Sequence, residues 1–451
     1  MAVRLRRWLA DLHSDHRRIA LGAARVAFFL LLGKVAGAFK EMAVAYRYGV
    51  SDVVDAYQFT LTLANWLPIA LVGACSVVLI PALVRSRRLP GAVHGQFLRE
   101  LQGATLLVGA ILALVLLVAW PLVLPWVGQG LTPEVARMST LLIWGFAPAA
   151  LFTVWTGLSA ARLRAHERHV NTLLDSLPAL VILGWVLASP SGGVWPLFWG
   201  TLVGYALQAL LLALFADRAD GHPGGAVLAR QSPQWSTLAT AAGVMLVGQL
   251  AMSLVGPIDQ YTAASLGDNA NAVLGYATRL LSLILGIGAA SVGRAALPVL
   301  ADIQGRGDAR HARSMALRWS AGMLAAGAVA VLAGWWLAPW AVGLLFERGA
   351  FTAQDTAVVA HVLRWGLLQL PFYFGVLILV QLLASQNRYR LMALIAVLNF
   401  LVKAILNQVL APVMGPAGIM LATGFMYASS YFCYLCLALR RPGDSSGEVS
   451  E

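Results

Sequence analysis

Residues 101–128 read LQGATLLVGAILALVLLVAWPLVLPWVG, without one charged side chain. A helix that crosses a membrane needs about 20 such residues. Comparable apolar runs recur along the whole chain, and 59% of its 451 residues are hydrophobic whereas 12% are charged. The longest plainly polar interruption is residues 217–235. This pattern excludes a soluble protein and a hidden soluble catalytic domain, so we expect an all-α integral membrane protein.

Twelve apolar segments reach the length of a membrane span when spans end at Gly, Pro and clusters of charge. The predicted ranges are 19–46, 56–84, 101–128, 137–161, 169–188, 194–216, 236–266, 271–301, 315–346, 355–384, 391–411 and 415–439. Cytoplasmic loops should hold most Lys and Arg residues. With both termini in the cytoplasm, 21 of the 32 lie in inner segments, and only Arg47, Arg137 and Arg348 lie outside. The charges therefore support twelve helices with cytoplasmic termini.

Two pairs of similar short segments indicate an internal duplication. The run IPAL at 80–83 matches LPVL at 297–300, and Trp144-Gly145 matches Trp365-Gly366. Similar segments in equivalent spans favour two six-helix lobes related by a pseudo-twofold axis along the membrane normal. The alternative is that the matching Pro and Trp residues coincide by chance. The predicted parts are a basic cytoplasmic segment at 1–18, an N-lobe at 19–216, a cytoplasmic linker at 217–235, a C-lobe at 236–439 and a cytoplasmic tail at 440–451.

Signatures of enzymes and cofactors are weak in this sequence. It contains no G-x-x-x-x-G-K-[ST] phosphate loop and no H-E-x-x-H motif. Asp52 and Asp55 could form an acidic metal pair, but they fit better as acids at a helix N-terminus. Cys75, Cys433 and Cys436 all lie in apolar segments, where we expect buried thiols rather than a disulfide or metal site. We therefore expect no enzyme, cofactor, metal or nucleic-acid partner.

Eight basic residues fall inside the predicted spans. A charge at this depth costs roughly 2.5 to 3.5 kcal/mol, so it normally faces a wet cavity or a partner. Three of them, Arg25, Arg294 and Arg318, lie close enough to span ends to reach the interface. The five deeper ones are Lys34, Lys40, Arg279, Arg364 and Lys403.

These five cations have only two acidic residues opposite them, Glu41 and Asp259. The surplus of positive charge predicts an anionic occupant such as a phosphate or diphosphate, which Arg and Lys coordinate well. The alternative is local pairing, of Lys40 in the neighbourhood of Glu41 and of Lys403 with Asp259.

Two stretches carry motifs that can be compared with a known family. The first is KVAGAFKE at 34–41, followed by Tyr48-Gly49 and by DAY at 55–57, and the second is GYATRL at 275–280, followed by Leu297-Pro298. These motifs resemble the MviN/MurJ family of the multidrug/oligosaccharidyl-lipid/polysaccharide exporter superfamily. The similarity extends weakly over all twelve spans. It implies two lobes that alternate access and flip a polyprenyl-diphosphate-linked saccharide.

The resemblance assigns substrate-binding roles to Lys34, Lys40, Asp55 and Arg279, and Arg364 joins them by its charge and depth. The chain departs from the family pattern in several places. Two family arginines are lysines here, Thr278 replaces an acid, Pro68-Ile69 stands where the family has an arginine pair, and two C-terminal helices are missing. These departures leave both a lipid II-like precursor and an exopolysaccharide repeat unit open as the cargo.

Some family members bind sodium between helices seven, eleven and twelve. Asp259, Asn407 and Thr423 resemble those ligand positions, and Lys403 matches a further ligand. An ammonium group there would replace the ion. We therefore expect Asp259 and Lys403 to pair, and any coupling to use protons or the membrane potential.

The preferred function is a flippase in the bacterial cytoplasmic (inner) membrane, with a lipid-linked saccharide, membrane lipids and polysaccharide-synthesis proteins as partners. An ion-coupled multidrug exporter and a non-transporting scaffold of an envelope-synthesis complex are the alternatives. Pro68, Pro148, Pro257 and Pro371 are candidate kinks, because proline removes a helix donor.

Overall fold

Helices make up the regular structure of the protein. The computed structural model describes residues 14–166, 168, 170–190, 192–221, 225–305, 308–386 and 388–439, and no strand occurs within these ranges. The first half contains α2 (Ser14–Tyr48), α3 (Asp52–Ser86), α4 (Gly91–Val127), α5 (Pro133–Ala165), α6 (Val170–Leu174), α7 (Leu177–Ala188) and α8 (Trp195–Asp220). The second half contains α9 (Gln234–Ser253), α10 (Val255–Leu266), α11 (Ala270–Gly305), α12 (Ala309–Phe346), α13 (Ala353–Leu367), α14 (Leu370–Ser385), α15 (Tyr389–Met414) and α16 (Pro416–Leu439). The expected all-helical class agrees with the described structure.

Nine helical segments in the described ranges are long and apolar enough to cross a membrane. Two of them are formed by consecutive helices, α6 with α7 and α13 with α14. Each of the twelve predicted spans overlaps one helix or two consecutive helices, and the span predicted at 236–266 overlaps α9 and α10. The chain is thus a multi-pass membrane protein. The total of twelve spans and the side of each terminus stay predictions.

Three prolines lie just after interruptions in the helical path. The breaks occur at Leu254 before Pro257, at 368–369 before Pro371, and at 175–176 before Pro178. A proline cannot donate to the carbonyl four residues earlier, so each break lies where a helical hydrogen bond is missing. Pro68 and Pro148, by contrast, lie inside the uninterrupted helices α3 and α5.

The chain divides into two compact units. Unit 1 comprises Met1–Val44, Leu67–Leu122 and Thr140–Leu246, and unit 2 comprises Ala45–Trp66, Val123–Ser139 and Val247–Glu451. One end of each of α2, α3, α4 and α5 therefore belongs to unit 2, and the first part of α9 belongs to unit 1. The predicted boundaries of the two lobes, which rest on sequence symmetry, stay predictions.

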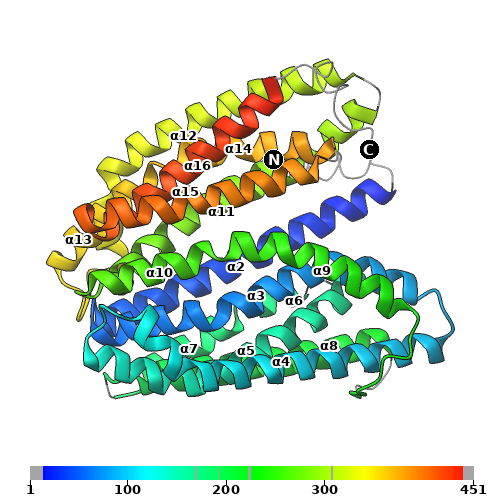
Figure 1. The fold of residues 1–451 in the computed structure, drawn as a ribbon, viewed down its shortest axis with the longest axis horizontal. Coiled ribbons are helices and arrows are strands. Elements are labelled where there is room, and N and C mark those ends of the chain that lie inside the picture. Colours follow the sequence, from blue (N-terminus) through cyan, green and yellow to red (C-terminus); the bar gives the residue numbers. More distant parts are fainter. Residues whose placement is uncertain are drawn as a thin grey trace, which may run out of the picture. The chain divides into compact units, whose positions relative to one another are not determined.

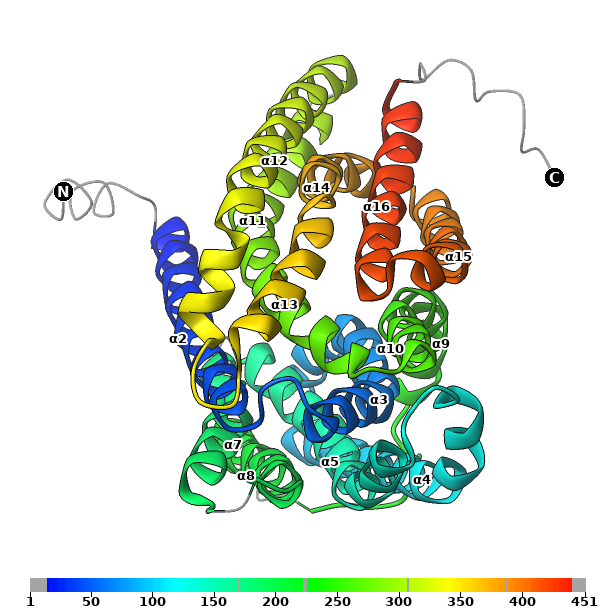
Figure 2. The same ribbon diagram turned by 90° about the vertical axis from the view of Figure 1, so that its left-hand side faces the viewer.

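Each unit has its own apolar core. In unit 1, side chains of α3, α4, α5 and α9 pack around Leu83, Phe97 and Leu158. In unit 2, α12, α14 and α16 lie side by side, as Figure 1 shows, and pack around Leu379, Leu382 and Tyr431. The view in Figure 2 shows α15 beside α16 in the same unit.

Candidate substrate and coupling sites

Lys34 and Lys40 lie in the part of α2 that belongs to unit 1. Lys40 Nζ lies 2.5 Å from Glu41 Oε1, and both side chains are buried. Lys34 is half-buried and forms no ion pair or hydrogen bond with any described residue. Gly37, three residues later on the same helical face, borders open space, because a Cβ placed there would meet nothing within 4 Å. Lys34 therefore lies on a face of α2 with room for a ligand.

Asp55 and Arg279 both lie in unit 2. The Asp55 carboxylate accepts hydrogen bonds from Ala272 N at 2.9 Å and from Asn271 Nδ2 at 3.2 Å. Both donors belong to the first turn of α11, whose N–H groups have no partner within their own helix and favour a negative charge. With 3% exposure, Asp55 caps α11 from a neighbouring helix. Arg279 Nη2 donates to Gln58 Oε1 at 3.3 Å.

Further polar contacts surround the Asp55 cap within unit 2. The Tyr276 hydroxyl donates to Gly49 O at 2.9 Å, and Ala350 N donates to Tyr46 O at 2.8 Å. Gly49 has a φ of +57°, and a Cβ there would lie 2.4 Å from Ala350 O, so only glycine permits this approach. We call the contacts of Asp55, Tyr276, Gly49 and Tyr46 the Asp55 cluster. It joins the beginning of α3 and the end of α2 to the second half of the chain.

Arg364 lies on α13, and its contacts explain a feature of α12. Its Nε donates to Trp335 O at 2.8 Å, and its guanidinium carbon lies 5.9 Å from the centre of the Trp335 ring. Pro339 is inside α12, four residues after Trp335, and has no N–H to donate to that carbonyl. Arg364 supplies the missing donor. Pro339 within a predicted span was a sequence signal for this pairing.

Lys403, on α15, is completely buried at 0% exposure in unit 2. Its Nζ lies 2.7 Å from each of three oxygen atoms, which belong to Asp259 Oδ1, Ile419 O and Thr423 Oγ1. The predicted pairing of Asp259 with Lys403 is present. Buried charges need such a complete set of partners, because their loss of hydration is expensive.

Asn407 completes this group, which we call the Lys403 site. Its Nδ2 donates to Asp259 Oδ1 at 2.9 Å and to Thr262 Oγ1 at 3.3 Å, whereas its buried Oδ1 has no hydrogen-bond partner among the described residues. The structure thus brings together all four predicted members, Asp259, Lys403, Asn407 and Thr423. Thr262 was not predicted, although it lies three residues after Asp259 on the same helix face.

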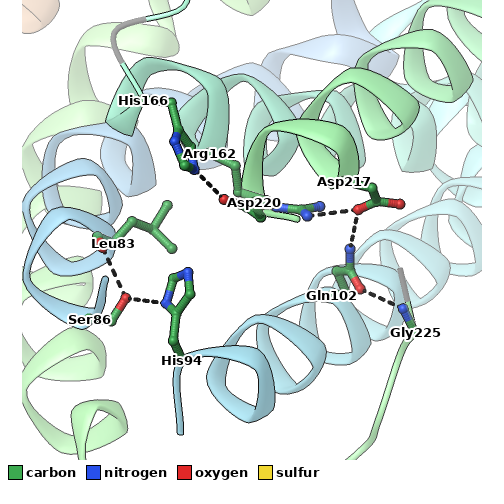
Figure 3. A network of polar contacts seen from close by, with 9 residues as sticks. All are labelled: Leu83, Ser86, His94, Gln102, Arg162, His166, Asp217, Asp220 and Gly225. Atoms are coloured by element: carbon green, nitrogen blue, oxygen red, sulfur yellow. Dashed lines mark hydrogen bonds and ion pairs between the residues drawn. The ribbon is translucent and has the colours of Figure 1, made fainter. Parts of the chain in front are cut away.

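A second polar network, absent from the predictions, lies in unit 1 (Figure 3). Arg162 on α5 contacts Asp217 and Asp220 on α8, each at 2.7 Å, and His166 Nε2 lies 2.5 Å from Asp220. Gln102 on α4 donates to Asp217 and accepts from Gly225 N of the linker. The network ties α4, α5, α8 and the linker together. Counting basic residues by loop could not reveal it, because the count ignores their partners.

The described residues contain no group of His, Cys, Asp or Glu side chains that could hold a metal ion. The predicted site residues instead form one lysine beside open space, one arginine that donates to Gln58, and one ion pair in which Lys403 is fully buried and Asp259 is 19% exposed. Lys34 and Lys40 belong to unit 1, whereas Asp55, Arg279 and Arg364 belong to unit 2. A shared site for these five residues therefore stays a prediction.

Comparison with known proteins gives one family. The model described as "Lipid II flippase MurJ" matches residues 44–449. A probable lipid II flippase MurJ from Synechocystis sp. is 26% identical over 455 residues, covering 94% of this chain and 82% of the relative. A lipid II flippase MurJ from Burkholderia cenocepacia is 26% identical over 453 residues, covering 93% and 83%.

Solved structures share the fold. A lipid II flippase MurJ in an inward closed conformation matches with a TM-score of 0.78 at 19% identity, covering 92% of this chain and 87% of that one. An inward-facing multidrug resistance MATE transporter of the MOP superfamily matches with a TM-score of 0.68 at 13% identity, covering 90% and 93%. At these identities the likeness concerns the fold alone.

Proposed function

This chain belongs to the lipid II flippase MurJ family, and from that membership we propose that it is a flippase for a lipid-linked saccharide precursor. The family match over residues 44–449 is the observation that carries the proposal. The cargo moves from the inner to the outer leaflet of the bacterial cytoplasmic membrane by alternating access. Protein partners that synthesise the polysaccharide deliver or consume it.

The diphosphate of the cargo binds first to Lys34. Support comes from the half-buried ammonium group, which has no described partner, and from the open space beside Gly37 on the same face. Phosphate oxygens are strong acceptors for a charged donor. Arg279 adds a second cation, as its position in the family motif implies, and one of its contacts is a hydrogen bond from Nη2 to Gln58 Oε1. Lys40 pairs with Glu41 and Arg364 donates to Trp335 O in this structure. These two residues therefore act on the cargo mainly through their positive electrostatic potential.

Alternating access requires contacts that can close one side of the protein and then release. The Asp55 cluster is our candidate for the closed side. It is composed of hydrogen bonds with modest individual strength, so it can be exchanged for others without a large barrier. Asp55 then acts through α11 rather than by contact with the cargo.

The Lys403 site supplies a fixed internal cation in place of an exchangeable one. Three oxygen atoms at 2.7 Å surround Nζ, which leaves the Asp259 carboxylate compensated without sodium. Coupling then uses protons or the membrane potential. Transport by proteoliposomes should be equal in sodium and choline buffers, and a several-fold requirement for sodium would overturn this assignment.

The substrate class is tested by mass spectrometry of lipids that remain on the gently purified protein. A polyprenyl-diphosphate saccharide that is retained by the wild type and lost from Lys34→Ala/Arg279→Ala supports the proposal. The mass of its glycan distinguishes a lipid II-like precursor from an exopolysaccharide repeat unit. Drug efflux without lipid movement favours the multidrug exporter, and full cellular function of the double variant favours the scaffold.

A further inference from the structure

A cavity of about 210 Å³ lies inside unit 1, and none of the predicted substrate or coupling residues lines it. Four helices line it: α3 with Val72 and Cys75, α4 with Ala104, α5 with Leu158, and α9 with Trp235. The lining is apolar almost throughout. The hydroxyl of Ser76, one of the few polar groups, donates a hydrogen bond to Val72 O at 2.7 Å. Such a space offers water few partners and suits hydrocarbon, since apolar cavities of about 150 Å³ bind benzene.

The cavity borders the side of α4 that faces outward from unit 1. Val108 lines the cavity and is 41% exposed, and Leu107 and Ile111 beside it are exposed as well. In a protein that crosses a membrane, this apolar surface meets lipid chains. A chain from the surrounding bilayer can therefore enter beside α4 without crossing a polar surface.

Positive charge lies at the end of the cavity where α9 begins. Trp235, the second residue of α9, is held by a hydrogen bond of its Nε1 to Glu100 Oε2 at 2.7 Å and by edge contact with Phe97. The Arg230 guanidinium carbon lies 5.6 Å from the centre of the Trp235 ring. Arg99 and Arg230 are both exposed, whereas Glu100 is buried.

The charge of Glu100 is already satisfied within the protein. Its two carboxylate oxygens accept from Gln96 Nε2, Gln231 N, Ser232 N and Trp235 Nε1. Among the described residues, the exposed charge that contacts Trp235 is the guanidinium group of Arg230. A ligand that matches both the apolar cavity and the cationic group beside Trp235 has a hydrocarbon chain and an anionic head. Trp235 then lies at the level where chain and head meet.

We propose that this cavity binds one acyl chain of an anionic phospholipid, whose phosphate pairs with Arg230 beside Trp235. The site is separate from the one proposed for the cargo, because none of its residues belongs to the Lys34, Asp55 or Lys403 groups. A bound lipid would join α3, α4, α5 and α9 from within. Its occupancy would stabilise unit 1 in membranes that contain anionic lipid.

Cys75 offers a direct reporter of occupancy. The variant Cys433→Ser/Cys436→Ser leaves it as the only thiol in the chain. This protein is placed in phosphatidylcholine nanodiscs with or without phosphatidylglycerol, and alkylation of Cys75 by N-ethylmaleimide is timed. We expect phosphatidylglycerol to slow alkylation about fivefold, the factor that corresponds to one arginine near an anionic surface. Arg230→Gln should abolish this difference, and Ala104→Phe should slow alkylation in both lipids by filling the cavity.

Ala110→Phe is the matched control, because Ala110 is an exposed residue of α4 that does not line the cavity. It should leave the lipid effect intact. A rise in Tm with phosphatidylglycerol, present in the wild type and absent in Arg230→Gln, provides a readout independent of the thiol. Equal alkylation in both lipids, or protection by undecaprenyl phosphate but not by phosphatidylglycerol, would overturn the proposal. Neither result bears on cargo binding at Lys34.

Discussion

Lys34 and Lys403 both lie in segments that the sequence predicts to span the membrane, yet their surroundings differ completely. Lys403 has three oxygen partners at 2.7 Å and no exposed surface. Lys34 is half-buried, has no described partner and lies on the face of α2 that borders open space. Lys403 is therefore part of the protein's own structure, whereas Lys34 is the lysine that we propose for a ligand. Depth in the membrane alone does not distinguish these roles.

Loss of the Lys403 ammonium should have the largest effect on stability. Lys403→Met leaves the Asp259 carboxylate, 19% exposed, without its cation, and breaking a buried ion pair costs up to about 3–5 kcal/mol. Unfolding of the purified protein in detergent, followed by intrinsic fluorescence during heating, should show a much lower Tm. Lys403→Met/Asp259→Asn removes both charges and should recover most of the loss. A single variant as stable as the double variant would contradict the structural role.

Removal of the Lys34 charge should affect binding rather than folding. Lys34→Met loses one charge-assisted hydrogen bond to the cargo, worth about 1.5–3 kcal/mol, which weakens lipid binding by about ten- to hundredfold. Its Tm should stay close to that of the wild type, because no described contact is lost. Lys34→Arg keeps the charge and serves as the control. Equal retention of the cargo lipid by the wild type and Lys34→Met would exclude this lysine from the binding site.

The Asp55 cap should make a smaller contribution. Asp55→Ala leaves the first turn of α11 without its acceptor, at a cost of about 0.5–2 kcal/mol. Asp52→Ala removes the same charge from the same turn of α3, but Asp52 has no described hydrogen bond that involves its side chain. Hydrogen exchange at Asn271 and Ala272 should therefore rise in Asp55→Ala and stay unchanged in Asp52→Ala. Equal exchange in the two variants would argue against the cap.

Arg364 tests whether a deep cation can be structural without any carboxylate. Arg364→Met removes the donor to Trp335 O and should cost about 0.5–1.5 kcal/mol, the typical net value of one hydrogen bond. Pro339→Ala restores the helical N–H to this carbonyl, so the same arginine substitution should cost less in that background. A double-mutant cycle on Tm measures the difference. Additive effects would mean that the two residues act independently.

The helical path shows how far local sequence rules reach. Long apolar runs predicted the helices, because a chain in lipid must satisfy its backbone hydrogen bonds internally. Pro257 and Pro371 were predicted as kinks and lie at breaks, but Pro68 and Pro148 do not interrupt their helices, and the break before Pro178 was not predicted. A proline always removes a donor, whereas its effect on the helix depends on neighbouring side chains. Arg364 at Trp335 is one such neighbour.

The candidate sites were predictable to different degrees. The pairing of Asp259 with Lys403 followed from the residue types and the family resemblance, because two opposite charges in a membrane interior favour each other strongly. The assignment of Asp55 to the first turn of α11 could not follow, since its partners lie 216 and 217 positions away in the sequence. The same holds for Arg162 with Asp217 and Asp220.

Sequence alone established that this chain crosses the membrane many times, that its helices carry buried cations, and which family its motifs resemble. These properties depend on hydrophobicity and charge, which belong to each residue wherever it lies. Tertiary structure decided which cations bind groups of the protein itself and which cation lies beside open space. The reason is physical: the cost of a buried charge depends on the atoms within about 4 Å of it, and folding alone brings those atoms there.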